Sequence, residues 1–291
     1  MDTKALSELL IRREPTSHKK SVGTVLVIGG SAFMPGAPIL ACHGAYRAGA
    51  GLVKLLFPES VYDIKNRLMP EVVLMPGFEE DNQSLSPENI ELLSEEMVQE
   101  VDTVVIGPGM SRNKETIEFI LQAIKVIDKP LIIDADALYA LSGNVNVLSE
   151  RTAPTILTPH EGEMGRLLEI DYQEVSKKRE EVTLTMAKEW NSFIVLKGNK
   201  TVVCSPDGQK CINETGSPAL ATAGTGDVLS GILAALLAQF PNQKLHTVLS
   251  AGVFIHGFAG DLAERDLGER SVVATDLIRY LPKVFKQAQS V

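Results

Sequence analysis

Thr222-Ala-Gly-Thr-Gly-Asp-Val-Leu-Ser-Gly231 carries the strongest structural signal in this chain. Two glycines flank a threonine, Asp227 follows, and an apolar run begins directly afterwards. A glycine-rich turn that opens a helix leaves backbone N–H groups without partners at the positive end of the helix dipole. We therefore expect a helix over Asp227–Phe240 whose start cradles an anion, and phosphate suits such a site.

Asp227 is the unusual member of this segment, because a carboxylate beside a bound phosphate is electrostatically costly. It must either hold a metal ion or accept the proton of a hydroxyl group that attacks phosphorus. The segment therefore favours phosphoryl transfer over nucleotide storage. A simpler interpretation is that Asp227 only stabilises the helix dipole. Short glycine motifs often occur without a function, so the hypothesis needs support from the rest of the chain.

Composition limits the classes of partner. The chain has 291 residues, a net charge of −9 and no basic block, so we expect no nucleic-acid partner. The longest apolar run, Ile232 to Ala238, is too short to span a bilayer, so we expect no membrane insertion. Cys204 and Cys211 flank a turn, so a disulfide between them is possible. The odd number of cysteines, with Cys42 as the third, and the lack of a signal peptide favour free thiols and a cytoplasmic protein.

Strand-like and helix-like segments alternate along the chain. Apolar strand-like runs lie at 24–28, 52–57, 71–75, 103–106, 131–133, 155–157 and 193–196, and a hairpin is expected at 201–203 and 210–212. Expected helices include 38–50, 87–100, 114–127, a long helix over 172–190, and 245–265 and 274–289. Repeated strand–helix units with apolar strands predict one α/β domain over residues 1–291, with a mostly parallel central sheet flanked by helices on both faces.

Small or polar residues follow five of the expected strands. They are Gly29-Gly30-Ser31, Gly107-Pro108-Gly109, Asp134-Ala135-Asp136, Thr158-Pro159-His160 and Lys197-Gly198. In an open α/β sheet, ligands bind along the edge that the carboxyl ends of the strands form. The five loops together predict one long binding site at that edge.

Several motifs follow one another in a defined order. They are Gly29-Gly30-Ser31 with Gly36-Ala37-Pro38, Arg47-Ala-Gly-Ala-Gly51-Leu-Val, Ile106-Gly-Pro-Gly109, Asp134-Ala-Asp-Ala-Leu138, Leu157-Thr-Pro-His-Glu-Gly-Glu163, Val195-Leu-Lys-Gly198 with Thr201, and Ala221-Thr-Ala-Gly-Thr-Gly-Asp227. Over about Gly23 to Tyr280 the chain resembles the ADP/ATP-dependent NAD(P)H-hydrate dehydratase family of the ribokinase-like superfamily. The final GTGD is shared with many ribokinase-like kinases, whereas the GAP, AGAGLV, GPG and TPHxGE segments together are typical of the dehydratase branch.

The resemblance implies a repair reaction. The S-form of NADH hydrate or NADPH hydrate returns to NADH or NADPH, with ADP or ATP as phosphoryl donor and Mg²⁺ as cofactor. The hydrate hydroxyl attacks the terminal phosphate and becomes a phosphate ester. The phosphate of this ester is a good leaving group beside an electron-rich ring nitrogen, and it departs. The compact form implies ADP dependence, although the residues themselves do not choose between ADP and ATP. It also implies the dehydratase step alone, an epimerase on a separate chain, and a homotetramer.

The same resemblance assigns the site residues. Asp227 is the catalytic base and contacts the substrate. Gly224, Thr225 and Gly226 form an anion hole, whose N–H groups stabilise charge on the transferring phosphoryl group. The other substrate-binding positions are Ala37, Gly109 and His160, and the nucleotide-binding positions are Lys197, Gly198, Asn199, Lys200, Thr201 and Gly226. No metal ligand is assigned.

Some of these residues allow a second interpretation. Gly107-Pro108-Gly109 also fits a tight turn, His160 a structural histidine and Lys197 a solvated lysine at a strand end. The loop residues Ser217 and Ala219 depart from the family pattern and affect only the fine placement of the substrate.

Other polar residues have no fixed role. Asp134 and Asp136 fit caps of the following helix as well as a metal or substrate role. Glu161 and Glu163, taken singly, fit first-turn carboxylates better than Mg²⁺ ligands. Three histidines inside expected helices are interpreted as packing or surface groups: His43, His246 and His256.

Three other functions compete with the dehydratase. A ribokinase-like kinase of a small hydroxylated heterocycle, such as a pyrimidine or thiazole vitamin precursor, would share GTGD but release a stable phosphorylated product. The GAP, GPG and TPHEGE segments argue against it. A dinucleotide oxidoreductase is disfavoured because Gly29-Gly30-Ser31 lacks GxGxxG spacing. A non-catalytic nucleotide sensor is disfavoured by the charge of Asp227.

Overall fold

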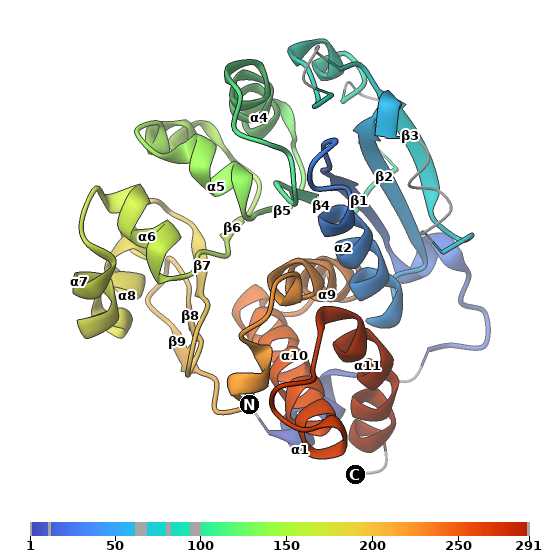
Figure 1. Ribbon diagram of the computed structural model, residues 1–291. Helices are drawn as coiled ribbons and strands as arrows, with labels where there is room; N and C mark the ends of the chain where they lie inside the picture. Colours follow the sequence, from blue (N-terminus) through green and yellow to red (C-terminus); the bar gives the residue numbers. More distant parts are fainter. Residues whose placement is uncertain (1, 11–12, 62–68, 80–82, 94–99, 290–291) are drawn as a thin grey trace.

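The strands form one continuous sheet in the order β3-β2-β1-β4-β5-β6-β7-β8-β9 (Figure 1). The computed structural model describes residues 2–10, 13–61, 69–79, 83–93 and 100–289. Strands β1 to β7 pair in parallel, whereas β8 is antiparallel to both β7 and β9. The expected α/β fold with a mostly parallel sheet is therefore confirmed. The strands are β1 (Thr24–Ile28), β2 (Leu52–Pro58), β3 (Val73–Gly77), β4 (Thr103–Ile106), β5 (Leu131–Ile133), β6 (Thr155–Leu157), β7 (Phe193–Leu196), β8 (Val202–Cys204) and β9 (Lys210–Ile212).

Helices cover both faces of the sheet (Figure 1). Alternate residues of β1 point to opposite sides, so Val25 and Leu26 belong to two different apolar cores. One core is covered by α1 (Thr3–Leu9), α2 (Gly36–Arg47), α9 (Thr225–Gln239), α10 (Leu245–Leu267) and α11 (Ala274–Ala288). The other is covered by α4 (Lys114–Val126), α5 (Asp136–Leu141), α6 (Glu161–Leu168), α7 (Tyr172–Lys177) and α8 (Arg179–Glu189). Short 3-10 helices are η1 (Lys19–Val22), η3 (Pro87–Ile90), η4 (Val145–Glu150) and η5 (Pro218–Leu220).

The order of the strands reverses between β1 and β4. From β1 the chain builds toward β3 on one side, and from β4 it builds toward β9 on the other. The loops that follow these two strands are joined by a hydrogen bond from Gly30 N to Pro108 O at 2.8 Å. Such a reversal point is where open α/β sheets bind ligands.

Helices α2 and α9 pack closely because both carry glycine at their contact. A Cβ on Gly44 would lie 2.5 Å from Val228 O, and a Cβ on Gly231 would lie 2.0 Å from Ala41 O. No larger residue fits at either position without moving a backbone. The close contact fixes the start of α9 relative to α2.

Two expected helices differ from the structure. The long helix expected over 172–190 is broken at Lys178, where φ is −132° and ψ is 36°, into α7 and α8. Of the helix expected over 87–100, the first four residues form the 3-10 helix η3, and residues 94–99 lie outside the described part of the chain. There the Asn89 side chain donates to Phe78 O at 2.7 Å and Ser86 O at 2.8 Å. Such side-chain bonds to the backbone compete with helix continuation.

The hairpin β8–β9 is confirmed. Its register shows whether Cys204 and Cys211 face each other across the two strands. Cys204 pairs with Lys210 and Cys211 pairs with Val203, so the two cysteines are not opposite each other. All three cysteines are free thiols, as the odd number favoured.

No helix in the described ranges combines the length and the apolar character that crossing a membrane requires.

Candidate active site

The anion cradle is built by the start of α9. Gly224 is the N-cap residue with φ of +91°, a backbone conformation that glycine adopts readily, and it provides no side-chain cap. The helix begins at Thr225, two residues earlier than expected, so Asp227 is its third residue. The first N–H groups of a helix have no partner within the helix. The N–H groups of Thr225, Gly226 and Asp227 are therefore available to an anion.

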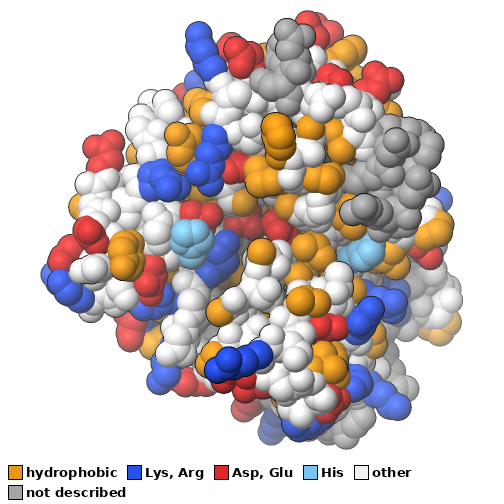
Figure 2. Space-filling model, in the orientation of Figure 1, with side chains coloured by type: hydrophobic (Ala, Val, Ile, Leu, Met, Phe, Trp, Pro, Cys, Tyr) orange, Lys and Arg blue, Asp and Glu red, His pale blue; other side chains and the backbone are white. Residues whose placement is uncertain are grey.

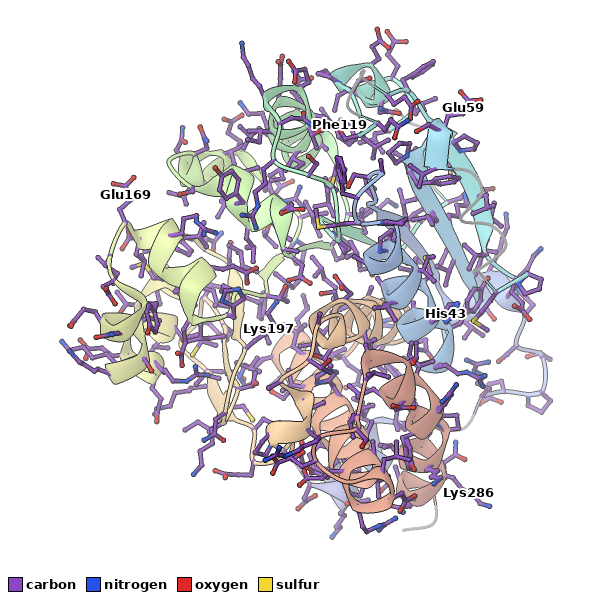
Figure 3. All side chains as sticks on the ribbon, viewed as in Figure 1. His43, Glu59, Phe119, Glu169, Lys197 and Lys286 are labelled. Carbon is purple, nitrogen blue, oxygen red and sulfur yellow. The ribbon has the colours of Figure 1, made fainter. Side chains whose placement is uncertain are left out.

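Lys197, at the end of β7, is the cation of the site and lies near the centre of the molecule (Figure 3). Its Nζ is 2.8 Å from Asp134 Oδ1, 3.7 Å from Glu163 Oε2 and 3.3 Å from the place a Cβ of Gly226 would take. Its side chain is only 18% exposed, so the alternative of a solvated lysine is wrong. Burial alone would lower the pKa of Lys197, but Asp134 and Glu163 raise it, and the ammonium stays charged.

Asp134 is a permanently charged partner of this lysine. The carboxylate is buried and accepts hydrogen bonds from Lys197 Nζ and from Ser230 Oγ at 2.6 Å. Burial would raise the pKa of Asp134, but the Lys197 ammonium and the two hydrogen bonds hold it below its usual value. The neighbouring Gly107 makes this placement possible, because a Cβ there would lie 1.8 Å from Asp134 O.

Asp134 and Asp136 do not cap the following helix, so that interpretation is wrong. The N-cap of α5 is Ala135, with φ of 49° and no side-chain cap. Asp136 instead accepts from Ser111 N at 3.0 Å and from Arg112 Nε at 2.8 Å. The positive φ of Ala135 is costly for a residue with a Cβ. Ala135 thus separates Asp134 from Asp136, and the two carboxylates contact different loops.

Asp227 contrasts with Asp134. No hydrogen bond or ion pair joins its carboxylate to another described residue, and the electrostatic influence of Lys197 reaches it only from a distance. Burial and repulsion from Asp134 raise the pKa of Asp227 to about 8. A carboxylate with a pKa near the working pH is suited to accept a proton from a substrate hydroxyl.

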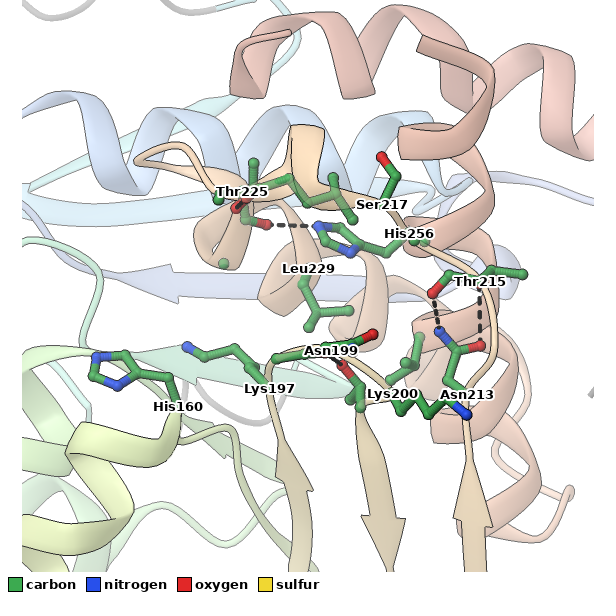
Figure 4. Close-up of a pocket in the computed structure, with 18 of the residues that line it drawn as sticks. His160, Lys197, Asn199, Lys200, Asn213, Thr215, Ser217, Thr225, Leu229 and His256 are labelled. Atoms are coloured by element: carbon green, nitrogen blue, oxygen red, sulfur yellow. Dashed lines mark hydrogen bonds between the residues drawn. The ribbon is translucent and has the colours of Figure 1, made fainter. Parts of the chain in front are cut away.

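The nucleotide positions line one cavity of about 780 Å³ (Figure 4). Its walls include the whole 197–201 loop, Thr225 and Gly226 of the cradle, and His160. On the surface, this face of the molecule is hollowed near its centre, with acidic side chains inside the hollow and Lys or Arg side chains beside it (Figure 2). The cavity therefore joins the predicted nucleotide loop to the predicted anion hole.

The cavity also contains residues that sequence reasoning missed. Asn213 and Thr215 form a pair of reciprocal hydrogen bonds at its rim, Nδ2 to Thr215 O at 2.8 Å and Thr215 Oγ1 to Asn213 Oδ1 at 3.1 Å (Figure 4). His256 of α10 lines the wall, so its interpretation as a packing or surface group was incomplete. The polar run Asn213-Glu-Thr-Gly-Ser-Pro-Ala219 was the available signal for the first two, and His256 had none.

Arg179, which sequence reasoning also missed, holds the start of the 197–201 loop through hydrogen bonds to its backbone. Its guanidinium donates to Leu196 O at 3.1 Å and to Lys197 O at 3.4 Å, and it forms an ion pair with Glu161. The side chain is 15% exposed. The break between α7 and α8 places Arg179 at the start of α8, and this explains why a continuous-helix interpretation hid it.

His160 combines both of its predicted interpretations. Its Nδ1 accepts from Gly162 N at 3.0 Å and Glu163 N at 3.2 Å and so caps α6. In the neutral ring the proton is then on Nε2, and the side chain, 58% exposed, lines the cavity. The second ring nitrogen, Nε2, lies 3.5 Å from Glu163 Oε1, so His160 contacts Glu163 through both its Nδ1 and its Nε2.

Ala37 and Gly109 lie together but do not line this cavity. A Cβ on Gly109, where φ is +66°, would lie 3.1 Å from the Cβ of Ala37 and 2.4 Å from Met34 O. Ala37 is one turn before Leu40, whose side chain borders Gly224. The two residues thus lie on the α2 side of the cradle, and the 197–201 loop lies on the other side.

The described residues contain no group of three or more His, Cys, Asp or Glu side chains placed to hold a metal ion. Glu163 instead accepts from His160 N at 2.8 Å, and Glu161 is paired with Arg179. Both glutamates therefore have the structural first-turn roles that were favoured for them.

The reversed strand order and the glycine-capped α9 define a ribokinase-like protein. A ribokinase-like superfamily protein from Enterococcus faecalis has the same fold, with a TM-score of 0.81 and 27% identity over 99% of this chain and 96% of that one. The family model for NAD(P)H-hydrate dehydratase matches residues 25–283, and the chain belongs to this family.

Individual relatives agree with this assignment. The ADP-dependent (S)-NAD(P)H-hydrate dehydratase of Bacillus subtilis is 34% identical over 96% of this chain and 94% of its own length. A crystal structure of the ADP/ATP-dependent enzyme from that organism, obtained with ATP and Mg²⁺, has a TM-score of 0.84 and 32% identity and covers 99% of this chain and 97% of that one. The bifunctional NAD(P)H-hydrate repair enzyme of Moorella thermoacetica is 40% identical over 96% of this chain. The chain spans about half the length of such bifunctional relatives, 52% in this case.

Proposed function

We propose that the protein dehydrates the S-form of NADH hydrate or NADPH hydrate to NADH or NADPH, with ADP or ATP as phosphoryl donor, and that residues 1–291 form one domain for this reaction. The observation that carries the proposal is Asp227, a carboxylate in the first turn of α9 that directly follows Gly226 of the cavity wall. Membership of the dehydratase family supports the choice of substrate.

In the proposed reaction, Asp227 takes the proton of the hydrate hydroxyl as that oxygen attacks the terminal phosphorus of the nucleotide. The bond between this phosphorus and its bridging oxygen breaks, and the shortened nucleotide leaves. The Thr225 and Gly226 N–H groups and Lys197 stabilise charge on the transferring phosphoryl group. The ring nitrogen lone pair then expels inorganic phosphate as the carbon–oxygen bond of the ester breaks, and loss of a ring proton restores the double bond. Mg²⁺, bound chiefly through the phosphates, would neutralise part of their charge.

Further parts of the proposal concern the surroundings of the enzyme. A separate epimerase chain would supply the S-form, as the family resemblance implies. A homotetramer and a cytoplasmic location follow from the family resemblance. Light scattering after size-exclusion chromatography would test the tetramer, and a dimer or monomer would refute it.

The direct test follows the absorbance of dihydronicotinamide after purified protein is mixed with authentic S-hydrate, Mg²⁺ and either ADP or ATP. We expect recovery of NADH only with nucleotide, and the faster nucleotide identifies the donor. Lack of recovery with both nucleotides would refute the proposal. A stable phosphorylated hydrate or heterocycle in the phosphorus NMR spectrum would then identify a small-molecule kinase.

A further inference from the structure

His256 contacts the anion cradle from a neighbouring helix. It lies in α10, its Nε2 is 2.9 Å from Thr225 O, and its ring lines the wall of the cavity beside Leu229 (Figure 4). Burial lowers the pKa of His256 to about 4, so the ring is neutral at physiological pH. Because the carbonyl oxygen only accepts, the ring proton is on Nε2 and is donated to Thr225.

The bonded carbonyl belongs to the peptide that carries a cradle N–H. Thr225 C=O and Gly226 N–H are the two ends of one planar trans peptide, so they point in opposite directions. A donor that holds the carbonyl therefore also fixes the direction of the Gly226 N–H. Gly226 has no Cβ to restrict its φ and ψ, so a contact from outside the helix can contribute to the orientation of this peptide.

The rest of Thr225 is held independently of this bond. Its Oγ1 donates to Leu220 O and Thr222 O, both at 3.1 Å, and these bonds locate the side chain but not the peptide plane that follows it. The Thr225 carbonyl can accept a helical N–H and the histidine together, because a carbonyl oxygen has two lone pairs. His256 is thus a second contact on this carbonyl, beside the helical N–H, and it comes from a separate helix.

We propose that His256 is a positioning residue that aims the Gly226 N–H at the transferring phosphoryl group by holding the opposite end of the same peptide. The inference rests on the proposed function for its kinetic test. It does not require His256 to touch the substrate or to change its protonation.

His246 provides a matched control. It lies in the same helix, and its Nε2 is 3.3 Å from a backbone carbonyl, Val203 O of β8. Burial lowers the pKa of His246 as well. It does not line the cavity. A general effect of losing a histidine–carbonyl bond from α10 would therefore appear in both His246→Ala and His256→Ala.

The test measures kcat, KM for the nucleotide and thermal unfolding for wild type, His256→Ala, His256→Gln, His256→Asn and His246→Ala. We expect His256→Ala to lower kcat by roughly 10- to 100-fold, a typical cost of a misplaced catalytic group, with a smaller change in KM. The amide nitrogen of glutamine reaches the Nε2 position, and that of asparagine does not. His256→Gln should therefore recover most of kcat, and His256→Asn should not.

Wild-type kcat in His256→Ala, or equal kcat in the Gln and Asn variants, would overturn the inference. If His256→Ala does not fold, the comparison of Gln with Asn decides the question. If the wild-type protein has no dehydratase activity, the proposed function fails and hydrogen exchange around Gly226 with saturating ADP becomes the readout. Slower exchange in wild type and His246→Ala than in His256→Asn would then support the anchor, and equal exchange would overturn it.

Discussion

The turn after β5 and the start of α9 each place an aspartate within the electrostatic influence of Lys197, with opposite results. Asp134, after β5, is held by Lys197 and Ser230, and these contacts keep its pKa low. Asp227, in α9, has no such partner, and burial with Asp134 nearby raises its pKa to about 8. Burial acts in the same direction on both groups, so the hydrogen-bond partners decide which one remains an anion. The site thus separates a carboxylate that stays charged from one whose pKa lies near the working pH.

The largest effect is expected from Asp227→Asn. The amide cannot accept the hydroxyl proton, so turnover should fall on the order of 1,000-fold. Nucleotide affinity should stay the same or improve, because a negative charge near phosphate is removed. Turnover by the absorbance assay and affinity by calorimetry check the two parts. Asp207→Asn, on an exposed hairpin turn, is the control that should leave turnover unchanged. Substantial activity in Asp227→Asn would show that another group is the base.

Asp134→Asn should have the next largest effect, on stability. It leaves the Lys197 ammonium with only the more distant Glu163, and breaking a buried ion pair costs about 3 kcal/mol of unfolding free energy. Urea unfolding measures this loss. Adding Lys197→Met should recover part of it, since the double variant has no uncompensated charge at that position. A loss below about 0.5 kcal/mol, typical of surface positions, would contradict the central role given to the pair.

The pH dependence of kcat/KM should reveal the raised pKa of Asp227. The active form is the carboxylate, so kcat/KM should rise as the pH approaches 8 and fall about tenfold per unit below it. In Asp134→Asn the repulsion between the carboxylates is gone, and the midpoint should move to lower pH. An acid limb near the ordinary aspartate value in the wild type would refute the assignment.

A smaller effect is expected on the pH dependence of Tm. The raised pKa of Asp227 means that folding favours its neutral form, so its contribution to stability is complete below about pH 4 and is lost as the pH rises toward 8. Asp134 has the opposite sign, because its pKa is lowered, and its contribution is lost as the pH falls below the ordinary value. Between pH 5 and 8, Asp227→Asn should therefore have a flatter Tm profile than the wild type. Parallel profiles would contradict this sign.

Local signals in the sequence were sufficient for the sheet, and the family resemblance named the residues 197–201 and Gly226, which line one cavity. Apolar runs predicted the strands, and their order in the chain placed the polar loops at one edge. Contacts between distant segments were not predictable. The pairing of Lys197 with Asp134 joins β7 to the turn after β5, and His256 reaches Thr225 from a separate helix. A single sequence gives residue types at these positions but not which of them meet.

The differences in secondary structure have similar causes. Periodicity alone favoured one helix over 172–190, and no proline or glycine marked the break at Lys178. The anchoring of Arg179 to Leu196 O and Lys197 O is a tertiary constraint. Likewise, Asn89 in the 3-10 helix η3 bonds to Phe78, the residue after β3. Tertiary hydrogen bonds overrode local propensity in both segments.

Carbon NMR of protein labelled at the aspartate carboxyl groups tests most directly whether Asp227 is the proton acceptor. The resonance that disappears in Asp227→Asn belongs to this residue. We predict that it titrates near pH 8 in the wild type and at lower pH in Asp134→Asn. Titration near pH 4, together with the exposed aspartates, would contradict the separation of roles between the two carboxylates.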